Sequence, residues 1–492
     1  MFQPIDTLSK RPEADMIVVP FFQDGKKAIS IVEIPELAEF IGPILEMGDF
    51  KGKQGATLLA YLKNMKEKRL LFLGLGEEKK CSMESLRRAF AAFVKRCQGK
   101  EWKHVNVILP KVKGIKESDI ERAVCEGISL CCYVFDEWKS KENKKPFYLE
   151  KINLIGSHDP KIGKKVEGIQ SGVNLARDLI NHNAHDMTPQ ALGEEAKKLA
   201  TQFSTVKTTI LDKQEIEEEK MGLFLAVGRG SRVDPALILV EYQGDPNSSD
   251  LTMVVGKGVT FDTGGLNLKP TNSIECQKSD MSGAGSALGL IKAAATIQLK
   301  ANVIVVIAAT ENGIDAHSYK PGDVFKSYLG KTVEIINTDA EGRLTLADAL
   351  SYGQKRFSPT RIIDMATLTG AIIVALGKER SGLFSNDDKF ASLCEQAGEI
   401  TGEKVWKLPM DPEYKHYLKS DIADLKNCGV RKGSSITAAI FLQEFIQDGT
   451  PWIHLDIAGT AYLDAPEEYH LTPATGVGVR LILELLEKLH GK

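Results

Sequence analysis

The chain has 492 residues, 43% of them hydrophobic and 26% charged, with a net charge of −3 at pH 7. This length exceeds what one core supports, so two domains are expected, and the near-neutral balance argues against a general nucleic-acid binder. The chain shows no secretory h-region and no apolar run long enough to cross a bilayer, so we expect a cytoplasmic protein without a membrane partner.

The first part of the chain, residues 1–160, alternates short apolar runs with amphipathic patterns. This alternation predicts an α/β domain. The expected strands cover 16–22, 69–76, 104–110 and 151–156, and the expected helices cover 82–98 and 118–138. A further helical pattern over 161–181 is expected to link this domain to a second one, residues 182–492.

The second domain opens on a helix start signal, with Thr188 as N-cap and Pro189 at the first helical position. Strand and helix patterns then alternate. Several strands are apolar on both faces, which is typical of parallel strands covered by helices. The expected strands cover 236–242, 251–258, 301–310, 332–337, 361–369 and 452–459.

Carboxylates follow one predicted strand end after another in this second domain. They are Asp262, Asp280 before a helix start rich in small residues, and Asp339 with Glu341 in "NTDAEGRL". Strand ends of an open α/β sheet share one crevice, so these groups are expected to meet. Four carboxylates packed together would repel one another without cations, and two divalent metal ions would balance them.

Each of these residues also has a purely structural interpretation. Asp280 could cap the helix that follows it, "DTGG" (262–265) could be a plain turn, and Lys257 and Lys269 could be solvated loop lysines. The chain contains no H-E-x-x-H motif and no G-x-S-x-G motif, which disfavours a histidine zinc site and a serine hydrolase. Spacing alone leaves the metal and structural interpretations open.

Several segments resemble those of the cytosolic leucine aminopeptidase family, whose members are two-metal hexameric enzymes. The resemblance covers residues from about 165 to the C-terminus. It implies an N-terminal macro-like α/β domain, a linking helix, and a catalytic α/β domain with a mixed, largely parallel sheet. The segments that carry it are "NLARDLINHNAHDMTP" (174–189), "VGKGVTFDTGGLNLKP" (255–270), "KSDMSGAG" (278–285), "NTDAEGRL" (337–344), "ATLTGA" (366–371) and "HLDIAGTA" (454–461).

The resemblance implies a ligand set for two divalent ions, Mn²⁺ or Zn²⁺, with Co²⁺ and Mg²⁺ as alternatives. Asp262 and Glu341 would bridge the two ions, and Asp339 would also use its backbone carbonyl. Lys257 would bind as a neutral amine, with its pKa lowered by the metal's charge. The implied ligands are Lys257, Asp262, Asp280, Asp339 and Glu341.

Lys269 and Arg343 are implied as the catalytic pair. Arg343, whose planar fork matches a planar oxyanion, would hold a bicarbonate ion together with the turn residues Ala340, Gly342 and Leu344. Gly342 would let the backbone approach that anion. The implied reaction releases N-terminal leucine and other mostly apolar residues from peptides. The metals would activate a water, bicarbonate would act as general base, and Lys269 would stabilise the oxyanion.

The implied pocket for the substrate side chain is lined by Gln277, Thr367, Gly370, Ala458 and Ala461. Gln277 stands where the family often has methionine, which argues against a strict leucine preference. Two other functions compete with peptide hydrolysis. A DNA-binding regulator would need a clustered basic groove on an assembled homohexamer. A structural protein without activity is disfavoured, because every ligand and catalytic position is present.

Overall fold

The computed structural model describes residues 1–31 and 34–490, and the chain divides into two compact units. Unit 1 comprises Met1–Gln170 and Ala465–Thr472, and unit 2 comprises Ser171–Asp464 and Pro473–Lys492. Helix α4 (Pro160–Asn181) is continuous through the division after residue 170, where a linking helix was expected. In the described part of the chain, no helix combines the length and apolar character that crossing a membrane requires.

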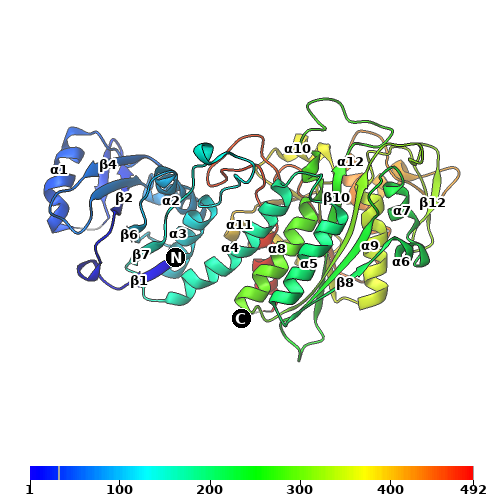
Figure 1. Cartoon of the computed structure of the whole chain (residues 1–492), viewed down its shortest axis with the longest axis horizontal. Helices are drawn as coiled ribbons and strands as arrows, with labels where there is room; N and C mark the ends of the chain where they lie inside the picture. Colours follow the sequence, from blue (N-terminus) through cyan, green and yellow to red (C-terminus); the bar gives the residue numbers. More distant parts are fainter. Residues whose placement is uncertain (32–33, 491–492) are drawn as a thin grey trace. The chain divides into compact units, whose positions relative to one another are not determined.

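Unit 1 is built on one sheet with strand order β1-β7-β6-β2-β5-β4, and β3 pairs with the end of β2. All neighbours are parallel except β4 on β5 and β3 on β2. Figure 1 shows this unit in blue and cyan. Its elements are β1 (Phe2–Ile5), β2 (Met16–Asp24), β3 (Lys27–Ser30), α1 (Ala38–Met47), β4 (Thr57–Tyr61), β5 (Arg69–Gly74), α2 (Met83–Cys97), β6 (His104–Ile108), α3 (Glu117–Cys131) and β7 (Lys151–Ile155).

The predicted helix over 118–138 is too long, because α3 ends at Cys131. The next apolar residues, Tyr133, Val134 and Phe135, are consecutive and do not continue one helical stripe, so they do not mark the buried face of a helix. The four strands predicted for this part of the chain correspond to β2, β5, β6 and β7.

Unit 2 is built on a mixed sheet whose described strands follow the order β16-β15-β18-β14-β10-β11-β9-β8. The central run β18-β14-β10-β11 is parallel, and antiparallel pairs flank it on both sides, as the predicted fold class requires. The strands are β8 (Val206–Leu211), β9 (Ala236–Gln243), β10 (Leu251–Asp262), β11 (Asn302–Asn312), β14 (Arg361–Ala366), β15 (Ser381–Ser385), β16 (Val405–Lys407) and β18 (Trp452–Asp456).

A separate sheet corrects the prediction of a strand over 332–337. Its strands are β12 (Val324–Lys326), β13 (Thr332–Glu334) and β17 (Leu425–Lys426). Ile335 is buried, and its N–H donates to the carbonyl of Asp323. Ile335 is therefore buried in irregular chain after β13, whereas Ile336 is exposed, and neither belongs to a strand of the main sheet.

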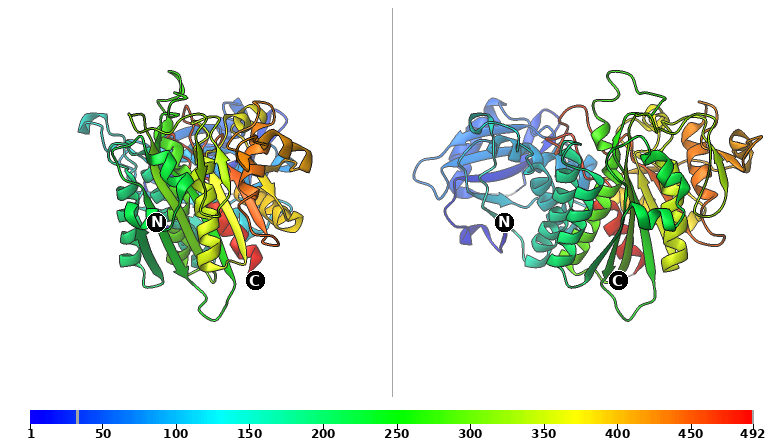
Figure 2. Two further views of the ribbon diagram at one scale, coloured as in Figure 1. Left: turned by 90° about the vertical axis from the view of Figure 1, so that its right-hand side faces the viewer. Right: turned by 45° about the vertical axis from the view of Figure 1, so that its right-hand side comes forward.

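Helices cover both faces of the large sheet (Figure 2). Helices α5 and α8 pack on one face, and α7 and α9 pack on the other. Helix α5 begins as predicted, since Thr188 accepts from the N–H of Ala191 and Pro189 follows it. The helices are α5 (Pro189–Gln202), α6 (Lys213–Glu218), α7 (Gly222–Gly228), α8 (Ser282–Ile297), α9 (Gly342–Phe357), α10 (Gly370–Leu376), α11 (Asp388–Thr401), α12 (Ser434–Gln443) and α13 (Val479–Leu489).

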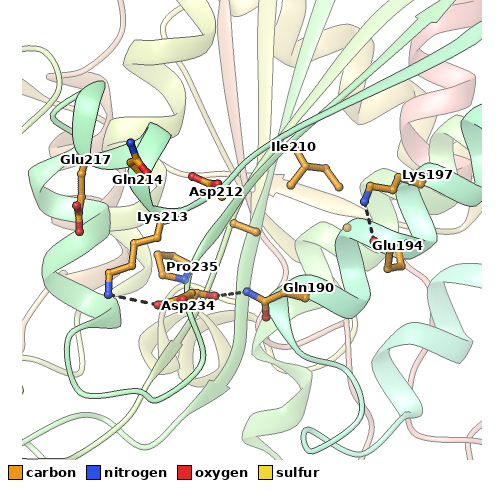
Figure 3. Close-up of a pocket in the computed structure, with 12 residues that line it drawn as sticks. Gln190, Glu194, Lys197, Ile210, Asp212, Lys213, Gln214, Glu217, Asp234 and Pro235 are labelled. Atoms are coloured by element: carbon orange, nitrogen blue, oxygen red, sulfur yellow. Dashed lines mark hydrogen bonds and ion pairs between the residues drawn. The ribbon is translucent and has the colours of Figure 1, made fainter.

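An open groove of about 580 Å³ lies beside β8, between α5 and α6 (Figure 3). Charged side chains along its walls form ion pairs with one another. Lys197 pairs with Glu194 at 2.7 Å, Lys213 pairs with Asp234 at 3.3 Å, and Gln190 donates to the Asp234 carbonyl at 2.6 Å. These pairs stabilise the surface and leave the groove without a convergent catalytic group.

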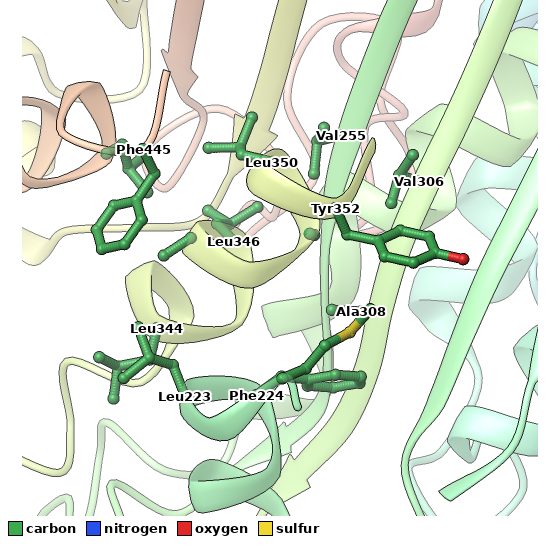
Figure 4. Packing of buried hydrophobic residues seen from close by; sticks show 14 of the residues in the cluster. Leu223, Phe224, Val255, Val306, Ala308, Leu344, Leu346, Leu350, Tyr352 and Phe445 are labelled. Atoms are coloured by element: carbon green, nitrogen blue, oxygen red, sulfur yellow. The ribbon is translucent and has the colours of Figure 1, made fainter. Parts of the chain in front are cut away.

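The core between α9, α7 and the sheet holds the site segment in place (Figure 4). Leu346 and Leu350 of α9 pack with Val255 of β10 and Val306 of β11, and all four are buried. Burial of such side chains contributes about 1.5–3 kcal/mol each. The N-terminus of α9 is therefore fixed against the ends of β10 and β11.

On the opposite face, glycines let α8 approach the sheet closely. A Cβ on Gly256 would stand 2.6 Å from the carbonyl oxygen of Gly283, and a Cβ on Gly283 would stand 2.7 Å from the backbone nitrogen of Lys257. Side chains at these positions would push the helix away. Because the first residues of α8 are small, the helix packs close to the sheet. The turn that precedes the helix therefore places Asp280 directly against Lys257.

Candidate metal centre

The predicted ligands come from four places in unit 2. Lys257 and Asp262 lie on β10, Asp280 lies in a 3₁₀ turn (Gln277–Met281), Asp339 follows β13 in irregular chain, and Glu341 directly precedes α9. The helix-cap interpretation of Asp280 fails, because Met281 occupies the N-cap position of α8 and no side chain caps that helix. The carboxylate of Asp280 is thus available to the site.

Three of these carboxylates converge. Asp262, Asp280 and Glu341 each offer an oxygen within 4.8 Å of the others, and all three side chains are buried. One oxygen of Asp280, Oδ2, is buried without a hydrogen-bond partner. Because a buried, unsatisfied carboxylate oxygen is costly, this oxygen marks a place for a cation.

Two lysines pair with the carboxylates. Lys257 Nζ lies 2.7 Å from Asp280 and 2.8 Å from Glu341. Lys269 Nζ lies 2.8 Å from Asp262 and 2.5 Å from Asp339, so Asp339 joins the cluster through Lys269. Two ammonium groups offset two of the four negative charges, and the remaining negative charge favours further cations.

The pKa values of the carboxyl groups report this crowding. Burial raises the pKa of Asp262 to about 6, and the negative charge of Glu341 is the second-largest cause of this increase. Burial also raises the pKa values of Asp280 and Glu341, against the effect of Lys257. Cations bound among these groups would relieve the same repulsion and return the pKa values toward their ordinary range.

The carboxylates around the two lysines favour the ammonium form of each. Burial opposes the ammonium form of Lys257, but Asp280, Glu341 and Asp262 outweigh it and raise its pKa. This direction is opposite to the one expected for a metal-bound amine, so a cation must displace that proton in order to bind Lys257. For Lys269, burial is likewise outweighed by its carboxylate partners, which raise its pKa.

Gly342 has a steric role that the sequence analysis did not foresee. A Cβ at this position would stand 2.7 Å from Lys257 Nζ and closer still to the carbon that bears it. Any larger residue would therefore displace the Lys257 side chain from Asp280 and Glu341. Gly342 also begins α9, where the first N–H groups have no partner within the helix.

Arg343 is buried beside this turn. Its Nη1 donates to the carbonyl of Asn427 at 2.9 Å, and its Nε has no hydrogen-bond partner among the residues that the structure describes. Burial lowers the pKa of the guanidinium. Of the other residues expected to hold an anion, Ala340 donates its N–H to Asn337 and Leu344 donates to Glu341. The unsatisfied Nε and the start of α9 are thus the donors that remain for an anion.

Comparison with known proteins decides the family. The family model described as the catalytic domain of the cytosol aminopeptidase family matches residues 174–483, and the N-terminal domain model of that family matches residues 18–142. The chain belongs to the cytosol aminopeptidase family. It is therefore a metal-dependent aminopeptidase, a hydrolase of peptide bonds, and the predicted family and enzyme class are confirmed.

Relatives and solved structures match over nearly the whole chain. A "probable cytosol aminopeptidase" of Protochlamydia amoebophila is 48% identical over 98% of this chain and 97% of that protein, and one of Chlamydia felis is 43% identical over 100% of both. A mutant of tomato leucine aminopeptidase superimposes with a TM-score of 0.88 at 33% identity, covering 99% of this chain and 96% of that chain. The bottromycin maturation enzyme BotP in complex with Mn gives 0.86 at 31% identity, covering 97% and 99%.

The residues present fit a divalent metal centre of this aminopeptidase family. The carboxylate oxygens of Asp262, Asp280 and Glu341 could hold such an ion, since oxygen donors suit Mn²⁺ and Mg²⁺ and are also accepted by Zn²⁺. Two structural observations support this fit. The buried Oδ2 of Asp280 has no hydrogen-bond partner among the described residues, and the carboxylates of the cluster outnumber its lysines.

Two asparagines that the sequence pattern did not single out support the cluster, Asn312 by a bond to Asp262 and Asn427 by bonds to the chain just before Asp339. Asn312, at the end of β11 and in register with Asp262, donates from Nδ2 to Asp262 Oδ1 at 2.7 Å and to the Thr338 carbonyl at 3.0 Å. Asn427 accepts from the N–H of Ile336 and donates to the carbonyl of Asn337. The strand-end pattern could have identified Asn312, whereas Asn427 follows a two-residue strand and has no such signal.

The predicted pocket residues lie on three segments of the aminopeptidase. Thr367 donates from Oγ1 to Asp280 Oδ1 at 2.8 Å, and its carbonyl accepts from Lys257 Nζ at 2.9 Å. Gly370 begins α10 and faces open space. Ala458 is half-buried, whereas Ala461 is buried and presents almost no surface to a substrate. The amide of Gln277 donates to the Ser273 carbonyl at 2.8 Å within its own turn.

Proposed function

We propose that the chain releases N-terminal leucine and other mostly apolar residues from peptides, at a centre that holds two divalent ions. The observation that carries this proposal is the convergence of Asp262, Asp280 and Glu341 with two lysines in one buried cluster. Lys257, Asp262, Asp280, Asp339 and Glu341 would hold the ions. When bound, they would supply an activated water and polarise the scissile carbonyl.

Lys269 and Arg343 are the proposed catalytic residues. Lys269 keeps its proton, because Asp262 and Asp339 hold it as an ammonium, and this charge can stabilise the oxyanion that forms on the scissile carbonyl. The unpaired Nε of Arg343 suits a planar anion, and bicarbonate there would supply the general base. Gly342 and Arg343 at the start of α9 add backbone donors.

Further properties of the family belong to this proposal. Manganese is favoured by the BotP complex with Mn, and zinc remains the alternative. A homohexamer in the cytoplasm is proposed from the family resemblance and from relatives named cytosol aminopeptidase. For the side-chain pocket we propose Gln277, Thr367, Gly370, Ala458 and Ala461, of which Ala461 is buried.

The test is hydrolysis of a panel of aminoacyl amides by enzyme that is first stripped of metal and then supplied with Mn²⁺ or Zn²⁺ in steps. We expect no turnover without metal, recovery that saturates at two ions per chain, and preference for leucyl and methionyl amides. We propose that the substrate's free α-amine binds one of the metal ions, so an acetylated leucyl amide should not be cleaved. Comparable cleavage of blocked and free substrates would refute an aminopeptidase mechanism that depends on that amine.

A further inference from the structure

We propose that Asp456 is a positioning residue that fixes two walls of the substrate side-chain pocket in register with the metal centre. It touches neither substrate nor metal and acts through the backbone of the two segments that follow β14 and β18. The inference rests on the proposed function, because it takes Thr367, Gly370 and Ala458 as pocket residues.

The side chain of Asp456 joins these two segments directly. It is fully buried at the end of β18. Its Oδ1 accepts from the N–H of Leu368 at 3.1 Å and from the N–H of Ala458 at 3.3 Å, and its Oδ2 accepts from Thr369 Oγ1 at 2.6 Å. One carboxylate therefore holds the segment after β14 and the segment after β18 at a fixed distance from each other.

The segment after β14 is also tied to the metal centre. Thr367 donates to Asp280 and accepts from Lys257, while the next residue, Leu368, donates to Asp456. A shift of this segment would thus move the pocket wall relative to the carboxylate cluster. Because a substrate's side chain and its scissile bond must be placed together, such a shift changes how well a side chain is accommodated.

A carboxylate suits this position for a chemical reason. Three donors point at Asp456 from two segments, and an ionised carboxylate accepts all three. An asparagine would keep one acceptor oxygen for the two N–H groups. Its NH2 group could donate to Thr369 Oγ1, whose hydroxyl could turn to Ser435 Oγ, 2.6 Å away, so the link between the segments is kept. Alanine would leave buried N–H groups without a partner and the segments without a link.

Asp364 provides a matched control. It is equally buried on the neighbouring strand β14. Its oxygens lie 2.7 Å from Trp452 Nε1 and 2.6 Å from His454 Nδ1, both within the sheet and away from the two pocket segments. Removing its charge perturbs the core to a similar degree without releasing a pocket wall.

The experiment compares kcat and KM for leucyl, alanyl and glycyl amides in the full-length, metal-loaded protein. Asp456→Ala should lower kcat/KM for the leucyl amide about tenfold relative to the glycyl amide, mainly through KM, the size typical of one lost pocket contact. Asp456→Asn should restore most of this ratio. Asp364→Asn should lower the Tm and leave the ratio unchanged, with two ions bound per chain in every variant.

Each outcome decides a separate point. An equal loss on all three substrates in Asp456→Ala would reduce Asp456 to a structural residue and overturn the inference. If Asp456→Ala does not fold, Thr369→Val removes one donor to Asp456 at constant shape. Thr369→Val should lower the ratio of kcat/KM for the leucyl amide to that for the glycyl amide, whereas Thr369→Ser should leave this ratio unchanged. An unchanged ratio in Thr369→Val would also overturn the inference. A wild-type protein that cleaves none of the amides would instead refute the proposed function.

Discussion

Lys257 and Lys269 differ in what surrounds them. Lys257 lies inside the buried cluster, between Asp280 and Glu341, where Gly342 leaves room for it. Lys269 lies at the edge, between Asp262 and the more exposed Asp339. In the first position a bound cation would have to displace the proton of Lys257, and the second position suits a charge that meets the substrate.

Replacing Lys269 tests this division. Lys269→Ala should lower kcat by about two to three orders of magnitude, the effect of losing one oxyanion-stabilising group. Metal content should stay normal, since Asp262, Asp280 and Glu341 remain. The control is Lys278→Ala, whose Nζ donates to the Asn181 carbonyl at 2.7 Å. Loss of one metal ion from Lys269→Ala would mean that the two lysines have exchanged roles.

Asn312 is expected to increase the affinity of the centre for metal ions. Asn312→Ala removes a donor from Asp262 Oδ1, and loss of such a supporting hydrogen bond weakens metal binding by about 10–100-fold. Calorimetric titration with Mn²⁺ measures this directly. Asn302→Ala is the control, because Asn302 lies at the other end of β11 and donates to the Asp245 carbonyl. Equal affinities in the two variants would contradict the assignment.

At the scale of elements, Asp348 of α9 fixes the short helix α7. Its Oδ2 accepts from the N–H groups of Leu223 and Phe224 at 2.9 and 3.0 Å, and its Oδ1 accepts from Tyr328 at 2.8 Å. The first N–H groups of α7 are thus satisfied by a neighbouring helix. This link also holds α9, and with it Gly342 and Arg343, against the sheet.

The stability that Asp348 contributes should depend on pH. Burial raises its pKa from 3.8 to about 7, so between these values the native state binds more protons than the unfolded state. The contribution is therefore complete below the unfolded pKa and decreases as pH rises through the folded one. Asparagine does not titrate, so the Tm of Asp348→Asn relative to wild type should rise between pH 5 and 8. Parallel Tm profiles would contradict this pKa.

The main sheet was readable from the sequence because its central strands are apolar on both faces. Asp262 ends the central strand β10, whereas Asp280, Asp339 and Glu341 lie in turns next to the sheet, and the family motifs then supplied individual roles. The strand expected over 332–337 is confirmed only for 332–334, because Ile335 is buried in irregular chain and a local apolar pattern does not distinguish such a residue from one in a strand. Asn427 and Asp456 act across long sequence separations, and only the folded chain shows their partners.

At the scale of the whole molecule, the acidic cluster lies at one edge of a large hydrophobic core. Chelation should therefore abolish peptidase activity while the far-ultraviolet circular dichroism stays close to that of the loaded enzyme, because metal loss disturbs local order only. Activity should return when Mn²⁺ is supplied. A cooperative loss of secondary structure on mild chelation would show that the metal holds the fold itself.

The order of strands along the chain also determines when the enzyme can first act during its synthesis. β18 completes the parallel centre of the sheet, yet it begins only at Trp452, about 90 residues after β14 begins at Arg361. A ribosome-bound chain that stops earlier lacks Asp456 and a central strand, and contacts of such long sequence separation form late. Truncated products of translation are therefore expected to be inactive, and a chain ended at residue 450 should show no hydrolysis of leucyl amide.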